Sequence, residues 1–252
     1  MASEIKQGTL ELVNHLPILQ VVTPMLIAPI LVVLNNKTLS WLLSFVGALA
    51  CLFISILLIQ AVSDGSILTY YLGGWVPPIG IEYRIDAANS ILLFLISIIS
   101  AIVLIFSYSS LHAEIPEEKH TLFYSCFLLC LTGLLGVVAT ADIFNVFVFL
   151  EISSLSTYVL VAQGAYLDRR ALSASFNYLI MGTIGATFFV IGIGYIYMAT
   201  GSLNMMDIAE RVSQLGDNRT IQAGFAFIVV GMGLKLATVS YTHLTLPTIV
   251  SV

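Results

Sequence analysis

Long apolar runs separated by short polar stretches repeat along the whole chain. They lie at residues 16–35, 39–62, 87–109, 121–140, 142–163, 171–199 and 221–237. A helix needs about 20 apolar residues to cross a bilayer core of about 30 Å, and most of these runs reach that length. The pattern therefore predicts an all-α integral membrane protein, a polytopic bundle of about seven transmembrane helices.

The spacing of the runs also predicts how some helices pack. The runs 121–140 and 142–163 are joined by almost nothing, so their helices are expected to be antiparallel neighbours. Small residues recur within the run 171–199, namely Gly182, Gly185, Ala186, Gly192 and Gly194. Small side chains let membrane helices approach closely, which favours a packed bundle over separate anchors.

Two polar segments interrupt or precede these runs. The loop 63–86 contains Gly73-Gly74-Trp75, Pro77-Pro78 and Gly80, which break helices. It is expected to be a structured connection, or a pair of short strands, outside the bilayer. Residues 1–15 are polar and lack the basic start of a signal peptide, so the first apolar helix is expected to be retained.

Composition supports the membrane class and gives no indication of a nucleic-acid partner. Of the 252 residues, 59% are hydrophobic and only 9% are charged, whereas about a quarter of the residues in soluble domains are charged. The net charge of −5 comes without a basic run, so nucleic acid is not an expected partner. With the N-terminus outside, the Lys and Arg residues of the loops divide equally between the two sides, and only the adjacent pair Arg169-Arg170 favours that orientation.

Several weaker candidate sites have simple structural interpretations. The three cysteines lie in apolar stretches without a CxxC pair, so they are interpreted as small buried hydrophobic residues, and no metal or redox cofactor is expected. Asp142 is expected to be the N-cap of the helix that follows it. A loop rich in His and Glu is expected to be a solvated surface rather than a metal site; its members are His112, Glu114, Glu117, Glu118 and His120.

Glu151 is the first of two ionisable residues deep in apolar sequence. Its position in the run 142–163 puts it near the bilayer midplane, where insertion of a charged side chain costs about 2.5–3.5 kcal/mol. Helical spacing puts Phe144, Phe147, Ser154 and Tyr158 on the same face. One interpretation is a buried carboxyl that only joins two helices by hydrogen bonds. The other is a carboxylate in a proton relay, with a proton affinity that depends on a nearby cation.

Lys235 is the second such residue. Gly224, Gly231 and Gly233 precede it, which is typical of a weakened or broken membrane helix beside a hydrated cavity. A lysine that extends from a helix end to the headgroups is the alternative. A changing distance between Glu151 and Lys235 could switch the lysine between holding and releasing a proton.

At these residues the chain resembles the antiporter-like subunits of Mrp cation/proton antiporters, respiratory complex I and membrane-bound hydrogenases. The resemblance is carried by Asp142–Glu151 (DIFNVFVFLE), Ser175–Met206 and Gly231–Ala237 (GMGLKLA), and the loop Gly73–Asp86 looks most like the D-type protein of Mrp antiporters. It implies that Glu151 matches the family's glutamate on the fifth helix and that Lys235 matches its lysine on the broken seventh helix. In the family these two residues are implicated in moving protons at mid-membrane depth.

The resemblance also implies a domain organisation. A whole subunit of this family has about fourteen helices with two inverted five-helix repeats, so this chain is expected to be the N-terminal half. Residues 16–120 would form the first three helices and residues 121–237 an incomplete first repeat. After Lys235 the sequence departs from the family pattern, and residues 238–252 are rich in Thr, Ser and Val. They are interpreted as a non-native tail. The chain would then be a truncated fragment, and His243 would not be a ligand.

The function implied by the resemblance is that of a transporter subunit rather than an enzyme. The leading hypothesis is a subunit of a multi-subunit Na+/proton antiporter in the bacterial inner membrane, with other membrane subunits as partners and without a cofactor. The alternative is a proton-pumping subunit of an NADH-quinone oxidoreductase or a membrane-bound hydrogenase. A purely structural membrane subunit is the third possibility.

Overall fold

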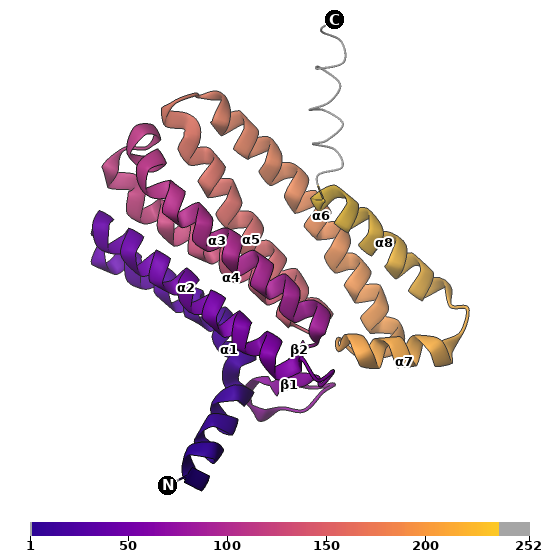
Figure 1. Cartoon of the computed structure of the whole chain (residues 1–252). Coiled ribbons are helices and arrows are strands. Elements are labelled where there is room, and N and C mark those ends of the chain that lie inside the picture. Colours follow the sequence, from indigo (N-terminus) through magenta and orange to yellow (C-terminus); the bar gives the residue numbers. More distant parts are fainter. Residues whose placement is uncertain (1, 237–252) are drawn as a thin grey trace, which may run out of the picture.

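The computed structural model describes residues 2–236, which form a bundle of long helices with a small β-hairpin at one end (Figure 1). Within this range the α-helices are α1 (Ala2–Leu34), α2 (Lys37–Val62), α3 (Ala87–Glu114), α4 (His120–Ala139), α5 (Ile143–Gln163), α6 (Arg170–Thr200), α7 (Met205–Leu215) and α8 (Arg219–Lys235). Short 3-10 turns lie at Leu72–Gly74, Glu117–Lys119 and Gly164–Tyr166. The all-α membrane fold is confirmed.

Six helices of the described part are long and apolar enough to cross a membrane. Their spanning stretches are Asn14–Leu34, Lys37–Val62, Ala87–Leu111, Glu117–Ala139, Ile143–Tyr166 and Arg170–Thr200. They correspond to the first six predicted runs. The seventh run forms α8, a helix of 17 residues that ends at Lys235, beside the residues that the structure does not describe. The interpretation of residues 238–252 as a non-native tail lies outside the described residues and stays a prediction.

Two helical features differ from the expectation. Helix α1 begins at Ala2, so the polar start of the chain continues the first membrane helix instead of preceding it. Helix α7 was not predicted at all, because its 11 residues are too few for a membrane span and are interrupted by charged residues. Its apolar residues Met205, Ile208, Val212 and Leu215 nevertheless recur at helical spacing, and Asn204 before them is a favoured N-cap.

The predicted structured loop is a β-hairpin. Strands β1 (Leu68–Tyr71) and β2 (Glu82–Ile85) pair antiparallel, with Leu68 opposite Ile85. The pair of short strands expected between the second and third helices is therefore confirmed. Figure 1 shows the hairpin and α7 at the same end of the bundle, near the turn from α4 to α5.

Backbone hydrogen bonds join three chain segments at this end, and we call them the end junction. The Ala141 N–H donates to the Glu82 carbonyl (2.8 Å), and the Met205 N–H donates to the Ala141 carbonyl (2.8 Å). The Ile143 N–H donates to the Leu203 carbonyl (2.9 Å). The hairpin, the α4–α5 turn and the α6–α7 turn are thereby held together.

The small residues of α6 allow a close approach of α8. A methyl group on Gly192 would lie 2.7 Å from the Gly224 carbonyl oxygen, and one on Gly231 would lie 2.6 Å from the Phe189 backbone nitrogen. Both distances are too short for a real side chain. The expected close packing of α6 is confirmed, and its partner is α8.

Candidate functional site

Glu151 and Lys235, which are 84 residues apart in sequence, form an ion pair in the structure. The Lys235 Nζ donates a hydrogen bond to Glu151 Oε1 and a second, at 3.4 Å, to Ser154 Oγ. Only 9% of the Lys235 side chain and 23% of the Glu151 side chain are exposed. The interpretation of Lys235 as a lysine that extends to the headgroups does not agree with this arrangement.

The pair lies well inside the bundle. Glu151 follows the start of α5 at Ile143 by about 12 Å along the helix axis, in a bilayer core of about 30 Å. Lys235 is the last residue of α8, which begins at Arg219 at the end of the bundle that holds the hairpin and α7 (Figure 1). Both charges therefore lie away from the end of the bundle that holds the hairpin, and the mid-membrane depth expected for Glu151 stays a prediction.

A glycine of the intervening helix α6 lets Lys235 lie close to that helix. Helix α6 packs against α5 on one side and against α8 on the other. A methyl group on Gly185 would lie 3.1 Å from the Gly231 carbonyl oxygen and 3.3 Å from Lys235 Cγ. The stem of the lysine thus lies directly against the missing side chain of Gly185.

The electrostatics of the site favour a paired state. In a low-dielectric environment an unpaired charge costs several kcal/mol, and a close opposite charge offsets much of that cost. Removing either partner would leave the other charge uncompensated. A carboxylate left alone could lose its negative charge by gaining a proton, and an ammonium left alone could lose its positive charge by releasing one. Proton occupancy and the distance between the two side chains are therefore linked.

Hydroxyl groups continue from the pair along α5, on the face that helical spacing predicted. Ser154 accepts from Lys235, and the Tyr158 hydroxyl lies near the Ser154 side chain. Phe147 stacks on Phe189 of α6, with ring centroids 6.4 Å apart. This face of α5 is therefore directed toward α6 and α8, and the polar face predicted from the sequence is confirmed.

The cysteines are free thiols, and only one of them contacts polar side chains of another helix. Cys51 and Cys126 are buried. Cys130 Sγ lies 3.5 Å from both Ser153 Oγ and Thr157 Oγ1 across the α4–α5 contact. Within residues 2–236 no group of three or more His, Cys, Asp or Glu side chains is placed to hold a metal ion.

Asp142 has the role expected of it, whereas His120 does not. The Asp142 carboxylate accepts from the Asn145 N–H (2.7 Å) as the N-cap of α5. His120 was expected in a solvated loop, but it is the first residue of α4 and only 1% exposed. Its Nε2 lies 3.0 Å from the Ile115 carbonyl oxygen. The hydrogen bond to this loop carbonyl explains why a polar ring is buried at the helix start.

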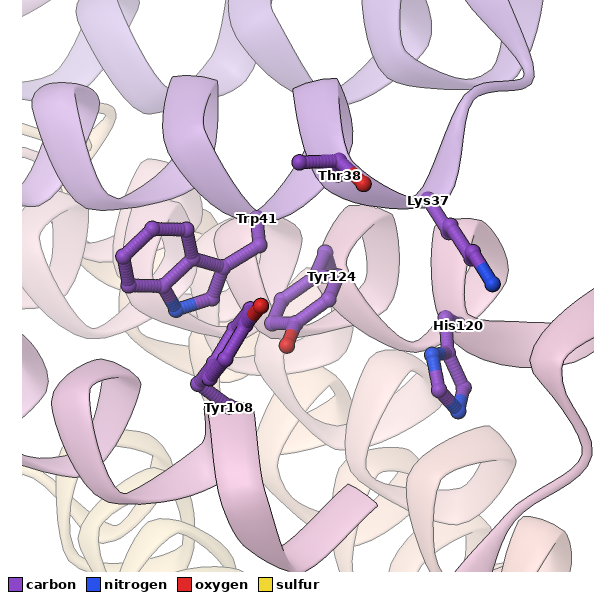
Figure 2. A pocket seen from close by; sticks show the side chains of 6 residues that line it. All are labelled: Lys37, Thr38, Trp41, Tyr108, His120 and Tyr124. Carbon is purple, nitrogen blue, oxygen red and sulfur yellow. The ribbon is translucent and has the colours of Figure 1, made fainter. Parts of the chain in front are cut away.

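Figure 2 shows the small cavity beside His120, between the ends of α2, α3 and α4. Its lining residues are Lys37, Thr38, Trp41, Tyr108, His120 and Tyr124. The cavity volume of about 20 Å³ is enough for one water molecule. Lys37 also pairs with Glu117 at the surface, so part of the predicted charged loop is solvated as expected.

Two buried polar residues of the end junction were not predicted from the sequence. Asn204 Nδ2 donates to Glu82 Oε2 (2.7 Å), and these residues are only 3% and 7% exposed. The Asn204 oxygen also accepts from the N–H groups of Met206 and Asp207 as the N-cap of α7. The cap could have been found from Asn204 and the apolar spacing after it, but nothing in the sequence indicates its bond to Glu82.

The chain is similar to several known membrane proteins. Residues 140–249 match the family model described as "NADH:quinone oxidoreductase/Mrp antiporter, TM". The chain is 39% identical over 226 residues to the N-type protein of the NADH-quinone oxidoreductase of Desulforudis audaxviator. It is 30% identical over 223 residues to the D-type protein of the Na(+)/H(+) antiporter of Bacillus subtilis. Each alignment covers 88% of this chain and 44% of the relative.

A solved structure shows the same fold. The chain superposes with a TM-score of 0.79 on a protein of the membrane-bound sulfane sulfur reductase, an archaeal respiratory membrane complex, at 32% sequence identity. The superposition covers 86% of this chain and 44% of that protein. The present chain thus spans less than half the length of each of these relatives.

Proposed function

The chain belongs to the family of antiporter-like membrane subunits that includes the D-type proteins of Mrp antiporters and the N-type proteins of NADH-quinone oxidoreductases, and from this membership we propose its function. The intact subunit translocates protons in exchange for a monovalent cation, in the first place Na+. It would do so as a multi-pass subunit of the bacterial inner membrane. Its partners would be the other membrane subunits of a hetero-oligomeric antiporter, and it would need no cofactor of its own.

The ion pair of Glu151 and Lys235 carries this proposal. In the closed pair, the carboxylate compensates the ammonium charge. Separation of the two side chains would leave an unpaired ammonium in apolar surroundings, and loss of its proton would remove that cost. Closure after reprotonation would complete one proton transfer, and the proton gradient would in this way drive a cation in the opposite direction.

The same pair would serve a second candidate function. The 39% identity to the oxidoreductase relative is higher than the 30% identity to the antiporter relative. In a redox complex, electron transfer in partner subunits would separate and close the pair. Genes for iron–sulfur subunits next to this gene would favour the enzyme, and genes for small membrane subunits would favour the antiporter.

The decisive experiment measures transport by the intact subunit. The full-length gene and its companion genes are expressed in a sodium-sensitive host that lacks its own antiporters. We expect gain of sodium tolerance and Na+-dependent proton flux in inverted vesicles, and loss of both in Glu151→Gln and Lys235→Ala. Glu210→Gln on the exposed surface of α7 is the matched control.

The outcomes separate the candidates. No sodium tolerance and no cation-dependent flux in the wild type would exclude the antiporter. Flux that survives both substitutions, at normal assembly of the complex, would favour a purely structural role for the pair.

A further inference from the structure

The ion pair is one end of a row of side chains that can pass protons. Glu151, Ser154 and Tyr158 are spaced by three and four residues, so they lie above one another on a single face of α5. Ser154 Oγ accepts from the Lys235 ammonium at 3.4 Å, and the Tyr158 hydroxyl lies near the Ser154 side chain, one turn further along the helix. Each hydroxyl can accept one proton and donate its own.

Helix α6 is shaped to hold the Tyr158 hydroxyl at the end of this row. A methyl group on Gly182 would lie 1.7 Å from the Tyr158 hydroxyl oxygen, so the hydroxyl fills the space that a side chain would take. Ser175 Oγ donates to the Tyr158 backbone carbonyl at 2.7 Å. The Tyr178 ring meets the Tyr158 ring edge-on, with centroids 4.9 Å apart. Three residues of α6 therefore fix the position of one tyrosine.

The row leads from the ion pair toward one face of the membrane. Tyr158 lies about 10 Å beyond Glu151 along α5, toward the end at Gln163 and away from the β-hairpin. Tyr158 is 5% exposed, whereas its neighbour Tyr178 is 39% exposed. The row thus runs from the ion pair to a buried tyrosine, whose ring neighbour Tyr178 is partly exposed.

A merely structural interpretation explains less of this arrangement. Hydroxyls in membrane helices commonly bond to a carbonyl of their own helix, as Ser156 does to Ile152 at 2.7 Å. Ser154 instead accepts from a charged group of another helix. If the side chain of Tyr158 served packing alone, phenylalanine would serve as well. No hydroxyl would then be needed against Gly182.

We propose that Ser154 and Tyr158 relay protons between Lys235 and the membrane face where α5 ends, an inference that rests on the proposed function. In one transfer the Lys235 ammonium gives a proton to Ser154 Oγ, and the Ser154 hydroxyl proton passes to the Tyr158 oxygen. The Tyr158 hydroxyl proton then passes to water at that face. One proton leaves, Lys235 becomes a neutral amine, and each hydroxyl keeps one proton.

The test compares variants that remove single hydroxyl groups in the full complex. We expect Tyr158→Phe and Ser154→Ala to lower the maximal Na+-dependent proton flux about tenfold or more, with the half-saturating Na+ concentration unchanged. Ser154→Thr keeps the hydroxyl and should retain the flux. Gly182→Ala should act like Tyr158→Phe, because it displaces the hydroxyl. Controls are Ser156→Ala on the same helix and Tyr195→Phe on α6.

Parallel measurements on Glu151→Gln and Lys235→Ala distinguish the two proposals. If those variants abolish flux while Tyr158→Phe and Ser154→Ala match the wild type, the relay is overturned and the proposed function stands. If all four match the wild type, both are overturned. A fall in flux that accompanies loss of assembled complex, and that Ser154→Thr does not rescue, would assign the hydroxyls a structural role and also overturn the relay.

Discussion

At the scale of single residues, Glu151 and Lys235 keep each other's charge tolerable inside an apolar bundle. Their exposed fractions of 23% and 9% leave little water to compensate either charge alone. Removing one partner of a buried pair costs about 3–5 kcal/mol, whereas replacing both is often neutral. The pair should therefore show strong coupling in stability, independent of its role in transport.

We expect Glu151→Gln and Lys235→Met each to lower the free energy of unfolding by about 3 kcal/mol. The double variant should recover most of that loss, because it leaves no unpaired charge, while transport stays absent. Thermal unfolding of the purified intact protein in detergent measures the first effect and vesicle flux the second. Additive losses in the double variant would contradict the coupling.

Asp142 predicts a pH effect at the start of α5. Burial raises the pKa of Asp142 above its ordinary value of 3.8, and hydrogen bonds from the Asn145 and Phe144 N–H groups offset part of the rise. The folded state therefore binds the proton more tightly than the unfolded state. The bound proton of Asp142 therefore stabilises the folded state at low pH. This stabilisation is lost as the pH rises from the ordinary pKa through the raised one.

We expect Asp142→Asn to unfold at a higher temperature than the wild type near neutral pH, because asparagine caps the helix without a buried charge. The difference in Tm should shrink below about pH 4, where the wild-type carboxyl is protonated in both states. Unfolding curves from about pH 3 to about pH 8 test this. A difference that stays constant across this range would show that the charge of Asp142 is not its cause.

At the scale of whole elements, the contact between α6 and α8 determines whether Lys235 reaches α5. The two helices meet through glycines, and the position of Gly231 allows no methyl group without movement of the backbone. Gly233 lies two residues further along α8, and a methyl group there would meet no atom of the described part of the chain within 4 Å. A comparison of Gly231→Ala with Gly233→Ala therefore separates the effect of helix packing from the effect of helix propensity on stability.

We expect Gly231→Ala to destabilise the intact protein by about 1–3 kcal/mol, as overpacking does, and to reduce flux by moving Lys235 away from Glu151. Gly233→Ala should be neutral, or stabilise by up to about 1 kcal/mol, because alanine favours helix over glycine. Unfolding and flux are measured on both variants. Equal effects of the two substitutions would contradict this account of the helix contact.

Asn204 joins two elements at the end junction, since it caps α7 and donates to the buried Glu82 carboxylate. We expect Asn204→Ala to cost about 1 kcal/mol for the cap and about 1–3 kcal/mol more for the unsatisfied carboxylate. Asn218→Ala, which removes the N-cap of α8, should cost only the first amount. Unfolding of the two variants gives the comparison, and equal losses would show that the bond to Glu82 contributes nothing.

At the scale of the molecule, the sequence predicted most of the bundle because long apolar runs leave few alternatives to membrane helices. The helix α7 escaped because it is too short for a membrane span, and the burial of His120 because its hydrogen-bond partner, the Ile115 carbonyl, lies across a turn. Periodicity could show that Glu151, Ser154 and Tyr158 share a face. It could not show that Lys235 meets that face, because the contact depends on glycines of a third helix, α6.

The end junction has a mechanical consequence for the whole molecule. It anchors the starts of α5 and α7 to the hairpin at one end of the bundle, and α8 begins at that end too. Lys235 is about 24 Å from the start of α8. A tilt of α8 by about 5° around its start would shift the ammonium by about 2 Å, enough to break a hydrogen bond. A small tilt of α8 is thus enough to open or close the ion pair, so α8 can act as a lever that carries Lys235 about 24 Å from its start.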